Sequence, residues 1–103
     1  MRMLMHAKFP LEPFNTMVRK GTVGATIQKI LEAGKPEAVY FTEYDGRRGA
    51  ILIIEVADAS KVPGYSEPWF LAFNASIEIH PVMVPEDLTR AGSAIEAAVK
   101  KYG

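Results

Sequence analysis

Four short runs of residues, in which apolar residues are continuous or alternate with polar ones, predict four β-strands. Successive side chains of a strand point to opposite faces, so alternation marks a strand with one buried face, and a continuous apolar run marks one covered on both faces. The runs occupy residues 2–9, 37–44, 50–58 and 75–84. Asp45-Gly46 separates the second and third runs and is typical of a hairpin turn. Pro81 cannot donate a ladder hydrogen bond, so the fourth strand is expected at a sheet edge or with a bulge.

Helical patterns fill the intervals between these strands. Residues 10–35 place apolar side chains three and four apart, but the apolar face changes sides near Gly21–Thr22, so two helical pieces are expected there. Ser66 is expected to cap a short helix over residues 67–73, after a loop at 59–65. A last helix is expected over residues 85–103, where the acidic residues come first and the lysines last, as the helix dipole favours.

The order of the elements predicts the fold class. It is β-α-β-β-α-β followed by a C-terminal helix, which is an α+β pattern typical of a ferredoxin-like sandwich. Right-handed crossovers place the two crossover helices on one face of a four-stranded antiparallel sheet, with the first strand between the third and the fourth. One domain over residues 1–103 is expected, because a chain of this length supports a single core.

Alternation also assigns each side chain to a face of the sheet. The face expected to meet the helices carries Met3, Met5, Ala7, Phe9, Val39, Phe41, Leu52, Ile54, Val56, Ile77 and Ile79. The opposite, open face carries Leu4, His6, Lys8, Tyr40, Thr42, Tyr44, Ile51, Ile53, Glu55, Ser76, Glu78, His80 and Val82. A solvated face does not need Ile51 and Ile53, and a closed core does not tolerate so many charges. The mixed face therefore predicts a homodimer that buries it around a partly polar cavity.

The amino-acid composition argues against several classes of binding partner and excludes some kinds of chemistry. Twelve basic and twelve acidic side chains cancel, which argues against nucleic-acid and membrane-surface partners because both need a positive field. The chain has no cysteine, so disulfides and thiolate chemistry are excluded. It has neither a secretory signal nor a membrane-spanning run, and a cytoplasmic protein is expected. Hydrophobic residues make up 49% of this small chain, so a partner is expected to cover some of them.

Four polar residues of the open face form the candidate catalytic group: His6, Glu55, Glu78 and His80. A histidine next to a carboxylate suits proton transfer near neutral pH. Histidines and carboxylates also suit zinc or iron, which is a second interpretation, although no metal or other cofactor is expected. In a third, the carboxylates form interface ion pairs with Lys8, Arg2 or the histidines.

Two aromatic sets are candidate contacts for a substrate. Tyr40, Thr42 and Tyr44 line the open face and suit hydrogen bonds to an oxygenated ligand, although such a stripe is also typical of cross-strand packing. Trp69 and Phe70 belong to the short helix. They predict either an anchor of that helix on the sheet or a lid over a cavity, with the loop at 59–65 as its hinge.

Three features together carry a family resemblance: the strand order, the run AILIIEVAD at residues 50–58, and an EPWF helix that leads into SIEIHPV at residues 76–82. In these the chain resembles the dimeric α/β-barrel superfamily, near muconolactone isomerase and related small domains. The resemblance implies two subunits packed sheet against sheet. It also implies isomerase- or monooxygenase-like conversion, or binding, of a small oxygenated or aromatic metabolite without a tightly bound cofactor. A non-catalytic structural or regulatory dimer is the alternative.

Overall fold

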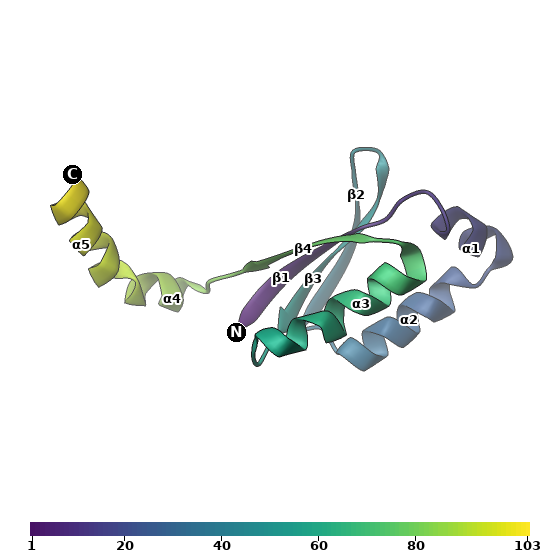
Figure 1. Cartoon of the computed structure of the whole chain (residues 1–103), viewed down its shortest axis with the longest axis horizontal. Helices are drawn as coiled ribbons and strands as arrows, with labels where there is room; N and C mark the ends of the chain where they lie inside the picture. Colours follow the sequence, from purple (N-terminus) through teal and green to yellow (C-terminus); the bar gives the residue numbers. More distant parts are fainter.

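The computed structural model describes all 103 residues and follows the expected order of elements (Figure 1). The strands are β1 (Arg2–Lys8), β2 (Ala38–Tyr44), β3 (Arg47–Glu55) and β4 (Ser76–Pro81). The helices are α1 (Phe14–Lys20), α2 (Val23–Gly34), α3 (Val62–Phe73), α4 (Pro85–Arg90) and α5 (Gly92–Tyr102), with a 3-10 turn, η1 (Ala59–Lys61), before α3.

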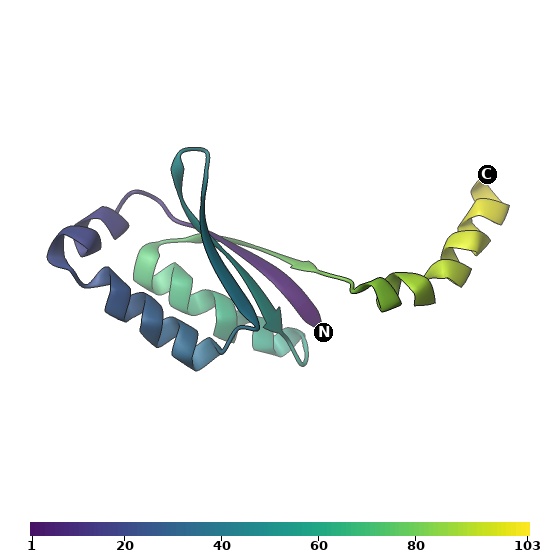
Figure 2. The same ribbon diagram turned by 180° about the vertical axis from the view of Figure 1, so that it is seen from behind.

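The four strands form one antiparallel sheet in the order β2-β3-β1-β4. Helices α2 and α3 lie side by side against one face of this sheet, with α1 at their end, and no helix covers the other face (Figures 1 and 2). The predicted ferredoxin-like α+β fold is therefore confirmed. The expectation for Pro81 is confirmed as well, since β4 is an edge strand and ends at this residue.

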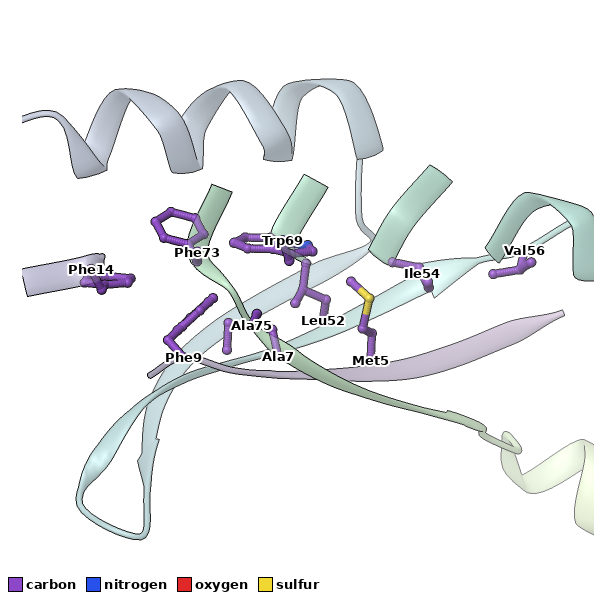
Figure 3. Packing of buried hydrophobic residues seen from close by; sticks show 11 residues of the cluster. Met5, Ala7, Phe9, Phe14, Leu52, Ile54, Val56, Trp69, Phe73 and Ala75 are labelled. Carbon is purple, nitrogen blue, oxygen red and sulfur yellow. The ribbon is translucent and has the colours of Figure 1, made fainter. Parts of the chain in front are cut away.

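An aromatic cluster holds the helices on the sheet. Phe9, at the end of β1, packs against Trp69 and Phe73 of α3, with ring centroids 5.7 and 5.2 Å apart. Phe14 of α1 lies 5.2 Å from Phe73 and closes the cluster (Figure 3). The side chains buried with it are Met5, Ala7, Ala50, Leu52, Ile54, Val56 and Ala75. The inward residues expected for β1 and β3 are thus largely confirmed.

Phe41 is an exception to the expected core. It lies on the helix side of β2, opposite Ala50, yet its side chain is 55% exposed. Because β2 is an edge strand, the helix layer does not extend over this residue. Its neighbour Tyr40, on the open side, is 66% exposed. The β2 edge therefore carries two uncovered aromatic rings.

The first helical segment breaks where the sequence predicts. Gly21 lies between α1 and α2 with φ of +72°, a left-handed conformation that glycine adopts without steric cost. Its N–H donates to the carbonyl of Val18 and ends α1. Helix α2 then restarts in a new direction, which explains why the apolar face of the sequence changes sides here.

The expected start of α3 is wrong. The helix begins at Val62 instead of after Ser66, so most of the expected loop at 59–65 is helical. Asp58 initiates η1 by accepting hydrogen bonds from the N–H and hydroxyl of Ser60, and Pro63 then fits the first turn of α3. Ser66 lies inside the helix and donates to the carbonyl of Val62. The hinge that the lid interpretation requires is therefore not a loop.

The C-terminal segment also differs from expectation. It forms two short helices instead of one, α4 and α5, and we call them the C-terminal arm (residues 85–102). The arm projects from the body along the line of β4 and gives the molecule extents of 59 × 28 × 21 Å (Figures 1 and 2). None of its residues is buried. Neither the arm nor any other helix combines the length and the apolar character needed to cross a membrane.

Trp69→Ala is expected to lower the free energy of unfolding by roughly 3–5 kcal/mol, because it empties the centre of the aromatic cluster. Urea unfolding followed by circular dichroism measures the change. Leu71→Ala is the matched control on the same helix, since Leu71 is 81% exposed and its loss is expected to cost less than about 0.5 kcal/mol. Equal losses in the two variants would contradict the anchor role of Trp69.

Candidate functional site

The strand register arranges the open-face residues in rows across the sheet. His6 lies opposite Ile51 of β3 on one side and opposite Glu78 of β4 on the other. Tyr40 of β2 continues this row beyond Ile51. The neighbouring row has Leu4 at its centre. Polar and apolar side chains therefore alternate on a surface that no other part of the chain covers.

Five polar side chains gather on this face, and we call them the open-face cluster: His6, Lys8, Tyr44, Glu78 and His80. Lys8 donates a hydrogen bond to Glu78 and forms an ion pair with it. His80 Nε2 lies 3.6 Å from the second carboxylate oxygen of Glu78. The Lys8 ammonium lies 5.4 Å from the centre of the Tyr44 ring. Glu78 is thus the carboxylate around which Lys8 and His80 gather.

His6 is the least satisfied member of the cluster. Its Nε2 atom is shielded from solvent and has no hydrogen-bond partner, an uncommon state for a buried polar atom. The Tyr44 ring approaches the imidazole edge-on, with centroids 5.6 Å apart. Gly49 makes this arrangement fit, because an added Cβ would lie 3.2 Å from Tyr44 Cδ1 and 3.4 Å from His6 Nε2. Sequence reasoning missed Gly49, although an isolated glycine within a strand signals a close approach of this kind.

The ion pair limits the chemistry available to Glu78. The hydrogen bond from Lys8 lowers the pKa of the Glu78 carboxyl below its usual range, and the same bond raises the pKa of the Lys8 amine. The charge of Lys8 and the nearby His80 side chain also lower the pKa of Glu78. A carboxylate with a lowered pKa is a weaker base, so Glu78 is better suited to orienting a cation than to accepting a proton.

Glu55, the fourth candidate catalytic residue, does not join the cluster. It lies opposite Arg2 at the far end of β1 and accepts a hydrogen bond of 2.6 Å from the N-terminal amine of Met1. Arg2 pairs instead with Glu37. No group of three or more histidine, aspartate or glutamate side chains lies close enough to hold a metal ion. Of the ion pairs in the third interpretation, the chain contains those of Glu78 with Lys8 and His80, whereas Glu55 and Arg2 have other partners. Glu55 lies apart from the other three candidate residues.

The candidate substrate contacts lie on both sides of the sheet. Tyr40, Thr42 and Tyr44 share the open face, and only Tyr44 reaches the cluster. Trp69 lies in the helix layer and is 1% exposed, which confirms the anchor interpretation. Phe70, beside it on α3, is 37% exposed. These five residues therefore cannot line one site in a single copy of the chain.

A cavity on the helix side of the sheet was not expected from the sequence. It has a volume of about 400 Å³ and lies between α2, α3 and the sheet. Its apolar lining includes Met5, Ile30, Leu31, Leu52, Ile54 and Trp69. Pro36, Pro68 and the small residues Ala33, Gly34, Ala57 and Gly64 complete the walls. Volumes of this size are typical of sites for small organic molecules.

Few polar groups meet this cavity. Glu55, Lys61 and Tyr65 lie along it, and the Tyr65 hydroxyl donates to the backbone carbonyl of Glu55. The indole nitrogen of Trp69 lies at the end of its ring that points away from Phe73 and toward Ile54 (Figure 3). The cavity therefore combines an apolar interior with two charged side chains, Lys61 and Glu55, and has the Trp69 ring in its wall.

The spacing between the two layers creates this cavity, and the residue pattern does not encode that spacing. The apolar residues of α2, among them Ile27, Ile30 and Leu31, are only half-buried, so this helix stands off the sheet. The one available signal was the presence of small residues that line the cavity on both helices, Gly34 on α2 and Gly64 on α3.

The Lys8–Glu78 pair predicts a pH-dependent contribution to stability. A carboxyl whose pKa is lowered by folding stabilises the fold above its ordinary pKa of 4.5, and this contribution is lost as the pH falls through the folded value. An amine whose pKa is raised stabilises below 10.5, and its contribution is lost as the pH rises through the folded value. The difference in unfolding free energy between the natural chain and Glu78→Gln is therefore expected to be largest near neutral pH.

Urea unfolding at about pH 3, 7 and 11 measures this difference, which is expected to shrink at both extremes. Glu67→Gln is the control, because Glu67 is exposed on α3 and forms no ion pair. A difference for Glu78→Gln that stays constant across this range would contradict the role given to the pair.

Comparison with known proteins adds no family to this description. No family model matches the sequence, and no curated protein matches it. Among solved structures, the chain is similar to the de novo designed protein Ferredog-Diesel, with a TM-score of 0.43 and 10% sequence identity over 78% of this chain and 83% of that one. The resemblance to muconolactone isomerase stays a prediction from the sequence, and the ferredoxin-like arrangement rests on the strand order described above.

Proposed function

We propose that this protein binds a small, largely apolar molecule in the cavity between α2, α3 and the sheet. The observation that carries the proposal is a volume of about 400 Å³ that reaches the core residue Trp69. The space is partly open to solvent, so an apolar occupant would displace water from the apolar walls and add contacts to them.

The lining indicates the chemical class of the ligand. A ring or a short hydrocarbon suits the apolar floor formed by Met5, Leu52 and Ile54. An oxygen acceptor on the same molecule suits the Trp69 indole N–H or the Lys61 amine. An aromatic or aliphatic acid satisfies both requirements. It belongs to the ligand class expected from the sequence, but that expectation placed the ligand between the sheets of two subunits, on the opposite face.

A second proposed function is the formation of a homodimer through the open faces of two copies. Leu4, Ile51 and Ile53 form an apolar strip in the middle of a face that no helix covers. Face-to-face sheets pack about 10 Å apart, so a second copy would cover this strip and enclose the open-face cluster. The resemblance to dimeric α/β-barrel proteins supports the same pairing. A structural or regulatory dimer of this kind needs no ligand.

Trp69 is the only tryptophan of the chain, so its fluorescence reports on the cavity directly. Titration with 2-naphthoate and with decanoate is expected to change this fluorescence saturably for at least one of the two acids. The aromatic and aliphatic probes distinguish the two ligand classes. The absence of a saturable change with both probes would contradict the proposed binding function.

Gly34→Phe is expected to abolish the binding, because Gly34 lines the cavity and the added side chain would point toward Tyr65, 3.8 Å from the new Cβ. Gly24→Phe is the matched control. Gly24 lies on the same helix, outside the cavity, and an added Cβ there meets nothing within 4 Å. Equal affinity in the two variants would show that the probe binds elsewhere on the protein.

Open-face pairing has a separate test. Ile53→Lys is expected to convert a dimer into a monomer in light scattering at micromolar concentration, because it places an unpaired charge in the apolar strip. Leu71→Lys is the control, since Leu71 is 81% exposed on the helix layer. A natural chain that is monomeric, or a dimer indifferent to Ile53→Lys, would contradict this pairing.

A further inference from the structure

The C-terminal arm carries an apolar stripe that touches nothing else in the chain. Ile95, Val99 and Tyr102 recur three and four residues apart on α5 and therefore share one side of the helix. They are 51, 59 and 79% exposed, and Leu88 of α4 is 54% exposed. Helices of this length are marginal in water without a packing partner. Some surface must therefore cover the stripe if the arm is to persist.

The dimensions of the chain support the same conclusion. It exposes 7041 Å², whereas a compact monomer of 11.4 kDa exposes about 5,800 Å². Its radius of gyration is 17.4 Å, compared with about 13 Å for a compact domain of this length. The excess surface of about 1,200 Å² exceeds the roughly 800 Å² that each partner contributes to a stable dimer.

The direction of the arm favours a second copy over the arm's own body. The arm continues along β4 and leads away from the sheet (Figures 1 and 2). Val84, immediately before α4, is extended, with φ of −80° and ψ of 164°, and it makes no reversal toward the body. The surface within reach of α5 in this conformation belongs to another molecule.

A second apolar surface with no cover lies at the β2 edge. A hollow of about 330 Å³ opens there on the helix side, lined by Phe9, Phe14 and Phe41 together with Thr42, Glu43, Arg48 and Gly49. Phe41 is 55% exposed in it. Arg48 is already engaged, because it donates to Asn15 and stacks 4.6 Å from the centre of the Phe14 ring. Glu43, in contrast, forms no ion pair within the chain.

We infer that α5 of one copy docks at this hollow on a second copy, and that the second copy returns the same contact. The apolar stripe would cover Phe41, the exposed aromatic ring of the hollow. A two-fold dimer makes the exchange reciprocal, so each copy buries both its arm and its hollow.

The area available is sufficient for such a dimer. A buried aromatic side chain removes about 150–250 Å² from water. Phe41, Tyr102, Leu88, Ile95 and Val99 are between 51 and 79% exposed, so they supply the apolar centre of an interface, and the polar residues around them supply the rest of the roughly 800 Å² per partner. This contact needs a second copy, as the open-face pairing proposed above does, but it uses a different surface of the molecule.

Cysteine cross-linking tests the inference. The chain contains no cysteine, so only the introduced cysteines can react with the cross-linker. Glu43→Cys protein is mixed with Val99→Cys protein, and a short bis-maleimide is added. A covalent dimer that contains one chain of each kind is the expected product. Leu71→Cys in place of Glu43→Cys is the control, because Leu71 is exposed on α3, away from the hollow, and no product is expected.

The double variant Glu43→Cys with Val99→Cys identifies the competing arrangement. A cross-link within one chain of this variant, with none between chains in the mixture, would overturn the inference and show that the arm folds back on its own body. No cross-link in either sample would overturn it as well. A product that persists in the Ile53→Lys background would support an arm exchange that is independent of the open face, and a natural dimer without the product would contradict the arm exchange alone.

A matched pair of charges on α5 gives a second readout. Val99→Asp places a carboxylate in the apolar stripe and is expected to weaken the dimer about tenfold or more in sedimentation equilibrium. Ala97→Asp introduces the same charge on the opposite side of the helix and is expected to leave the dimer unchanged. Equal effects of the two substitutions would contradict a role for the stripe.

Discussion

The contact of Phe9 with Trp69 and Phe73 is the interaction on which the rest of the structure depends. It fixes α3 to the end of β1, and Phe14 joins α1 to the same point. The two layers are therefore closely packed at this end. The cavity begins beside Trp69 and lies between α2, α3 and the sheet. The cluster thus marks where the two layers pack closely and where the space between them begins.

Much of the architecture follows from local pattern alone. Strand alternation assigned Met5 and Leu52 to the buried face, because a period of two residues leaves no other choice once the helices lie on one side. The same alternation brought His6 and Glu78 together on the open face, where the register places them opposite each other. The helix break at Gly21 was predictable since a change of apolar face cannot continue through a straight helix.

Other features depend on distances that a linear pattern does not contain. Glu55 points to the same face of the sheet as His6. It lies at the far end of β3, opposite Arg2, so the two side chains share a face without lying close together. The start of α3 depends on the hydrogen bonds of Asp58, which compete with a simple cap at Ser66. The C-terminal arm has the amphipathic pattern of an ordinary packed helix, and only the three-dimensional arrangement reveals that its apolar side has no neighbour within the chain.

Trp69 is a core residue and also forms part of the wall of the cavity. Because of this, substitutions of Trp69 are restricted during evolution. A substitution there changes folding and the shape of the cavity together, so selection for a new ligand at this wall would conflict with selection for a stable chain. The opposite wall, on α2, is formed by half-buried side chains such as Ile30 and Leu31. If the cavity binds a ligand as proposed, substitutions on α2 can change the ligand preference while α3 preserves the fold.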